Sequence, residues 1–242
     1  MAWMDKQPAM ERFDARSRSI DQAAVDEGLR NYMLRVYNYM GSGLLLTGIV
    51  AYFVARSGFY QAFTGPVFWV VALAPLGLVW FLSARIDRMS FASAQAAFWA
   101  YAALNGLSLS LIFVKYTGAD ITRAFVVAAA MFGAMSLYGY TTKKDLSGWG
   151  SFLFMGLIGI IIASIVNIFV GWSALSFAIS VIGVLVFTGL TAYDTQQIKE
   201  MYYEGESHEA VGKLSLMGAL RLYLDFLNLF LMLLSLFNSN RE

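Results

Sequence analysis

The sequence contains no cysteine and only one histidine, His208. The missing cysteines exclude disulfides, thiolate catalysis and thiolate metal sites. A single histidine leaves little scope for the imidazole chemistry of serine proteases and zinc enzymes. Charge is also scarce, at 14% of the 242 residues, against roughly 25% in an ordinary soluble domain. So few charged residues are poorly suited to cover the surface of a soluble domain.

The sequence is rich in apolar residues instead, which make up 59% of the chain and gather in seven long runs. These runs approach or exceed the length of about 20 residues that a helix needs to span hydrocarbon. They lack the alternation of barrel strands. We therefore predict an all-α polytopic membrane protein, a bundle of seven transmembrane helices. The helices are expected at residues 32–55, 65–84, 91–114, 121–140, 152–170, 173–195 and 214–237.

The first 30 residues are polar and mixed in charge, which is not the pattern of a cleavable signal peptide. We predict a polar cytoplasmic N-terminal tail over residues 1–30 and one transmembrane domain over 31–242; a surface helix over 20–33 is the alternative for the tail. With the N-terminus inside, 12 of the 17 basic residues lie in cytoplasmic segments and four outside. This predicts a cytoplasmic N-terminus and an outside C-terminus, in what we expect to be a bacterial plasma (inner) membrane.

Two acidic residues, Asp194 and Asp225, lie within apolar runs, whereas the other 14 fall in tails or loops. A charge at the centre of a membrane helix costs about 2.5–3.5 kcal/mol, so such carboxylates are expected to be paired, protonated or hydrated. Both lie in the cytoplasmic halves of consecutive antiparallel helices, so they can face each other. Two facing carboxylates resist double ionisation, which makes their charge responsive to pH or cations.

An alternative explanation exists for one of the two aspartates. Arg221 lies four residues before Asp225, the spacing of an intrahelical ion pair, so Asp225 can be neutralised within its own helix. Asp194 has no basic partner at three or four residues. For Asp225, the sequence leaves open both a pairing with Asp194 and an ion pair with Arg221.

Five stretches carry a resemblance to a known family: TAYDTQQIK, ALRLYLDFLNLFLMLLSLF, SARIDRMS, NGLSLSLIFVKYTG and KKDLSGWGSFL. Over the whole membrane part the chain resembles the Bax inhibitor-1 family. The resemblance implies a seven-helix fold with helix seven packed centrally. It also implies a pH-sensitive calcium leak governed by an aspartate pair that matches Asp194 and Asp225. A further implication is a latch, in which an arginine at the cytoplasmic end of helix two bonds Asp194; Arg85 is the first candidate and Arg88 the second.

Calcium prefers about 6–8 oxygen ligands. Four other polar residues lie near the aspartates in the sequence: Tyr193, Thr195, Tyr223 and Asn228. This set cannot form a tight cage without water, so we predict a weak calcium site at the aspartate pair. We therefore expect calcium and protons to be the binding partners, held only while they pass through the protein, and we expect no cofactor.

Two functional hypotheses follow, and neither is an enzyme. The first is a pH-sensitive calcium or cation leak channel gated by the aspartate pair. The second is a non-conducting regulator that binds a membrane-anchored protease or another membrane protein, since bacterial relatives are associated with such a protease. No catalytic residue is predicted, because the only histidine is expected in a loop. A net charge of +1 gives no indication of nucleic acid as a partner.

Overall fold

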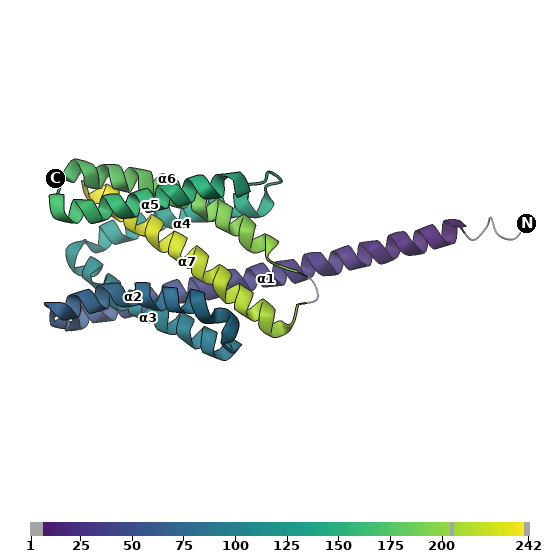
Figure 1. The fold of residues 1–242 in the computed structure, drawn as a ribbon, viewed down its shortest axis with the longest axis horizontal. Helices are drawn as coiled ribbons and strands as arrows, with labels where there is room; N and C mark the ends of the chain where they lie inside the picture. Colours follow the sequence, from purple (N-terminus) through teal and green to yellow (C-terminus); the bar gives the residue numbers. More distant parts are fainter. Residues whose placement is uncertain (1–6, 204–205, 240–242) are drawn as a thin grey trace, which may run out of the picture.

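The computed structural model describes residues 7–203 and 206–239, and every regular element within these ranges is helical (Figure 1). Seven of the helices are long and apolar enough to span a membrane. They are α1 (Gln7–Ser57), α2 (Pro66–Arg85), α3 (Phe91–Lys115), α4 (Gly118–Thr141), α5 (Ser147–Val170), α6 (Ser173–Glu200) and α7 (His208–Ser239), with short 3-10 helices η1 (Phe59–Ala62) and η2 (Ile86–Arg88). The prediction of an all-α seven-helix membrane bundle is confirmed.

Several helices run beyond the apolar stretches that predicted them. α1 begins at Gln7, α6 continues to Glu200 and α7 begins at His208. Figure 1 shows the N-terminal part of α1 projecting away from the other helices. An apolar run marks only the part of a helix that meets lipid, because the backbone hydrogen bonds of a helix continue equally well through polar turns. His208, expected in a loop, is therefore helical, while the boundary between tail and membrane domain stays a prediction.

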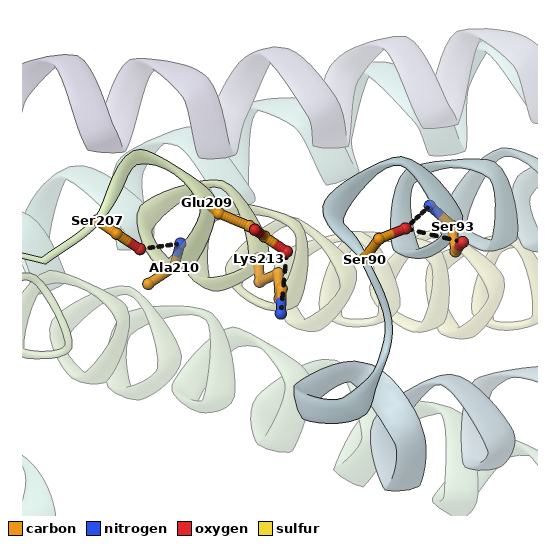
Figure 2. Close-up of polar contacts among 6 residues, drawn as sticks. All are labelled: Ser90, Ser93, Ser207, Glu209, Ala210 and Lys213. Atoms are coloured by element: carbon orange, nitrogen blue, oxygen red, sulfur yellow. Dashed lines mark hydrogen bonds and ion pairs between the residues drawn. The ribbon is translucent and has the colours of Figure 1, made fainter.

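Local capping fixes where α3 and α7 begin (Figure 2). The hydroxyl of Ser90 accepts a hydrogen bond from the Ser93 amide at 3.3 Å, and the Ser207 hydroxyl accepts one from Ala210 at 3.2 Å. Each bond satisfies one of the amides that the first turn of a helix leaves without a partner. In the first turns of α7, an ion pair of 3.4 Å joins Glu209 and Lys213. These contacts start α7 outside its apolar run.

The packing of the bundle brings α6 and α7 together. α7 packs against α1, α3, α4 and α6, and α6 packs against α4 and α5, while α2 lies on α3. Two strongly apolar helices, α2 and α5, bury few side chains, as expected of helices whose faces meet lipid. That helix seven is the centre of the bundle stays a prediction from the family resemblance.

Polar side chains join α1, α3 and α7 inside the apolar core. The Thr47 hydroxyl of α1 lies 2.8 Å from the Ala102 carbonyl oxygen of α3 and 2.7 Å from the Tyr223 hydroxyl of α7. All three residues are almost completely buried. Hydrogen bonds of this kind hold transmembrane helices in register, since lipid offers no alternative partner.

Candidate functional site

Glycines bring the backbones of α6 and α7 close together on both sides of the two aspartates. A Cβ atom at Gly183 of α6 would lie 2.6 Å from the Met232 sulfur of α7. A Cβ atom at Gly218 of α7 would lie 2.9 Å from Cγ2 of Ile198 on α6. Such contacts are closer than real side chains make, so a larger residue at either point would have to displace the Met232 or Ile198 side chain. Asp194 and Asp225 lie between these two contacts along their respective helices.

The side chains of Asp194 and Asp225 hydrogen-bond to each other. Asp225 is only 4% exposed, and its Oδ2 atom is buried without a hydrogen-bond partner. Asp194 is half-buried. An ionised carboxylate only accepts hydrogen bonds, so a bond between two carboxyl groups requires one proton on one of them. A hydrogen bond between these two carboxyl groups thus calls for one shared proton, and it leaves Asp225 Oδ2 without a partner.

The pair lies in a cavity of about 470 Å³ between α5, α6 and α7. Gly150 and Ser151 form part of the α5 wall. A Cβ atom at Gly150 would lie 2.6 Å from the Tyr193 ring, so this glycine lets α5 approach the tyrosine next to Asp194. The cavity is large enough for several water molecules beside the carboxyl groups.

Arg221 lines the same cavity and interacts electrostatically with both aspartates. Over the residues that the structure describes, it forms no ion pair within 4.0 Å of Asp225 or Asp194. The carboxyl partner of Asp225 is thus Asp194 and not the arginine one turn away. Arg221 places a positive charge near the pair without occupying either carboxyl group.

The four polar neighbours separate into two groups. Tyr193 and Asn228 line the cavity, and the Asn228 amide nitrogen donates to the Leu224 carbonyl oxygen at 2.8 Å. The hydroxyl of Thr195 instead donates to the Thr191 carbonyl oxygen at 2.7 Å. The fourth neighbour, Tyr223, bonds to α1 as described above. Only Tyr193 and Asn228 are therefore placed to help the aspartates bind an ion.

The two arginines considered for a latch lie elsewhere. Arg85 ends α2 and Arg88 ends η2, and both side chains are exposed. Neither lines the aspartate cavity, and across the described ranges neither forms a hydrogen bond or ion pair with Asp194. The latch stays a prediction, and the structure brings Arg221 to the site instead.

Gln196, two residues after Asp194, is a structural anchor that the sequence did not predict. Its amide nitrogen donates to the Lys144 carbonyl oxygen at 2.8 Å, and its oxygen accepts from the Leu146 amide at 2.8 Å. The same loop is shaped by Asp145, whose carboxylate accepts from the Ser147 backbone amide, which lowers the pKa of Asp145. The only sequence signal was a glutamine next to a membrane span. Gln196 connects the α4–α5 loop to the helix that carries Asp194.

No cluster of three or more histidine, cysteine, aspartate or glutamate side chains that could hold a metal occurs in the described part of the chain. The two carboxyl groups and the cavity beside them remain as the candidate ion site. Such a site suits a hard cation that keeps most of its hydration, since calcium needs more oxygens than two side chains supply.

These features define a class of protein: a polytopic helical membrane protein in which two carboxyl groups meet inside the bundle. Residues 29–242 match the family model described as "Inhibitor of apoptosis-promoting Bax1". The chain belongs to this family, the Bax inhibitor-1 family, and the resemblance of its motifs is confirmed.

Similar proteins occur in several bacteria. The chain is 51% identical over 237 residues to the inner membrane protein YbhL of Escherichia coli (strain K12), covering 96% of this chain and 100% of YbhL. It is 49% identical over 219 residues to a protein of Rickettsia prowazekii (strain Madrid E), covering 90% and 93% of the two chains. A protein of Caulobacter vibrioides is 46% identical over 243 residues, covering 94% and 97%. The family and the seven apolar helices agree that this is an integral, multi-pass membrane protein.

Proposed function

We propose that this protein is a pH-sensitive calcium leak in which Asp194 and Asp225 bind both the permeant ion and the controlling proton. The strongest support is that the two carboxyl groups bond to each other in a cavity between membrane helices while Asp225 Oδ2 has no partner. A free carboxylate oxygen in such a place is a ligand for a hard cation. The family resemblance points to the same pair of residues. We further propose, from the placement of Lys and Arg, that the N-terminus faces the cytoplasm of a bacterial inner membrane.

The proposed pH response follows from the shared proton. While the proton is present, the pair carries one negative charge, which the positive charge of Arg221 offsets. When the proton is lost, two negative charges face each other and attract a divalent cation strongly. Falling pH restores the proton and removes that attraction. Calcium flux is therefore expected to rise with pH through the range in which the shared proton dissociates.

The test is calcium entry into liposomes that contain the purified protein, followed with a trapped indicator at several pH values. Asp194→Asn and Asp225→Asn are each expected to slow the initial rate by about tenfold or more, because losing one ligand charge weakens cation binding by at least about 1.4 kcal/mol. Both variants should also lose the pH dependence. The control is Asp26→Asn, which removes an exposed carboxylate of α1. Unchanged flux in both pair variants would exclude the aspartates from conduction.

The alternative, a non-conducting regulator of a membrane-anchored protease or another membrane protein, is supported by a separate observation. The N-terminal part of α1 projects beyond the other helices, where a partner protein can reach it (Figure 1). Removing residues 1–30 should then reduce recovery of the partner in co-purification from membranes. Equal recovery with the shortened chain would exclude this part of α1 as the contact.

A further inference from the structure

A polar pocket lies on the outside of the bundle, between α1 and α3 and apart from the aspartate cavity. Its volume is about 500 Å³, and it is lined by one face of α1, where Leu34 is the one aliphatic residue among the lining residues described, together with Trp99 of α3. Asn31, Arg35, Asn38 and Ser42 recur on that face at intervals of three or four residues, so they form one continuous polar row. Polar residues of membrane helices usually face the interior of a bundle, so an outward-facing polar row needs an explanation.

The N-terminal end of the row, at Asn31 and Arg35, matches the headgroup level of a bilayer. The span that contains it, Asp26–Ser57, has 32 residues, which is about 48 Å of helix at 1.5 Å per residue. Hydrocarbon is only about 30 Å thick, and about 40–45 Å with the headgroups. If Arg56 marks the far surface, Arg35 lies near the opposite edge of the hydrocarbon and Asn31 lies among the headgroups. Trp99 beside them is typical of this interfacial zone.

The side chains of the pocket offer hydrogen-bond donors and positive charge but no negative charge. No aspartate or glutamate is among the described residues that line it. Arg35 is exposed, and within the described ranges its guanidinium has no hydrogen bond or ion pair. The side-chain amides of Asn31 and Asn38 likewise have no hydrogen bond there, whereas the Ser42 hydroxyl donates to the Asn38 carbonyl oxygen at 2.5 Å. A guanidinium fork flanked by two amides is a suitable arrangement for a phosphate group.

We propose that this pocket binds the headgroup of an anionic phospholipid, with Arg35 on the phosphate and the acyl chains along the adjoining apolar surface. A second copy of the chain is a poorer occupant. Two copies inserted in the same direction and related by a two-fold axis place equal residues at equal depth, so Arg35 would face Arg35. The proposal does not depend on the leak function, because the pocket shares no lining residue with the aspartate cavity.

The test measures lipid binding to the purified full-length protein in detergent. Native mass spectrometry would titrate the protein with dioleoyl phosphatidylglycerol and, separately, with dioleoyl phosphatidylcholine. The unmodified protein is expected to bind phosphatidylglycerol more tightly. Arg35→Gln should weaken that binding by about tenfold or more, as for loss of a charge-assisted hydrogen bond. Lys143→Gln is the control, because Lys143 is exposed and basic but does not line the pocket.

Three results would overturn the proposal. The first is equal affinity of the unmodified protein for the two lipids, and the second is an Arg35→Gln variant that keeps the preference for phosphatidylglycerol. The third uses the absence of native cysteine: an Asn38→Cys variant that forms disulfide-linked dimers efficiently in membranes would make this face a contact between copies. Retention of the lipid preference in Lys143→Gln, with its loss in Arg35→Gln, supports the proposal.

Discussion

Replacing Arg221 with glutamine is expected to strengthen calcium binding at the aspartate pair. In the structure the arginine lines the cavity with Asp194 and Asp225 but forms no close ion pair with either. Its positive charge therefore lowers the attraction of the pair for any cation that enters. Glutamine keeps a similar length and polarity, so the substitution removes mainly the charge.

The size of the effect follows from the helical spacing. Residues four apart on a helix have Cβ atoms about 5–6 Å apart, and two unit charges about 6 Å apart interact by about 3 kcal/mol at an effective dielectric constant of about 20. Arg221 is only half-buried, so solvent screening reduces this to about 1–2 kcal/mol. The apparent calcium affinity should then increase by about five- to thirtyfold.

The assay is the calcium dependence of the initial flux rate in liposomes, at fixed pH and ionic strength. The half-saturating calcium concentration should fall in Arg221→Gln and stay unchanged in Lys213→Gln. That control removes one basic charge from the same helix, at a residue paired with Glu209 and outside the cavity. An unchanged or higher half-saturating concentration in Arg221→Gln would refute the electrostatic reasoning, even if the aspartates prove essential for flux.

Two further predictions concern packing around the site. A Cβ atom at Gly139 of α4 would collide with the Ala192 carbonyl oxygen of α6, so Gly139→Ala should cost about 1–3 kcal/mol and lower the midpoint of thermal unfolding in detergent. Gly133→Ala on the same helix should leave the midpoint unchanged, since no atom lies within 4 Å of the added carbon. Equal midpoints for the two variants would contradict the close contact between α4 and α6. Gln196→Leu removes both hydrogen bonds to the α4–α5 loop and should speed hydrogen exchange of the Leu146 amide by about tenfold. An unchanged exchange rate would show that the loop does not depend on this side chain.

The number of helices and the meeting of the two aspartates were predictable because both depend on coarse properties of the sequence. Long apolar runs are sufficient to predict membrane helices. Consecutive helices joined by a short loop must run antiparallel, so carboxyl groups at similar depth on both can meet. The helix ends were less predictable, since the start of α7 lies in polar turns before the apolar run at Leu214 and is marked only by the capping hydroxyl of Ser207.

The directions of individual side chains were beyond sequence reasoning. Thr195 follows Asp194 directly, yet it bonds to Ser136 of α4 at 3.0 Å, because consecutive helical residues point about 100° apart. Arg221 has the spacing of an ion pair with Asp225 and does not form one, since the carboxyl group is already bonded across the helix interface. Such outcomes depend on which helix faces are in contact, and the sequence does not specify that.

The close contacts at Gly183 and Gly218 have a consequence for side-chain length at the acidic pair. Because the Met232 and Ile198 side chains pack directly onto Gly183 and Gly218, α6 and α7 lie close together on both sides of the carboxyl groups, and this spacing suits the short side chain of aspartate. Glutamate in place of Asp194 would keep the charge but push its carboxyl group past its partner. Glutamate and aspartate are therefore not interchangeable here, and the reach of each acid contributes to the site as much as its charge.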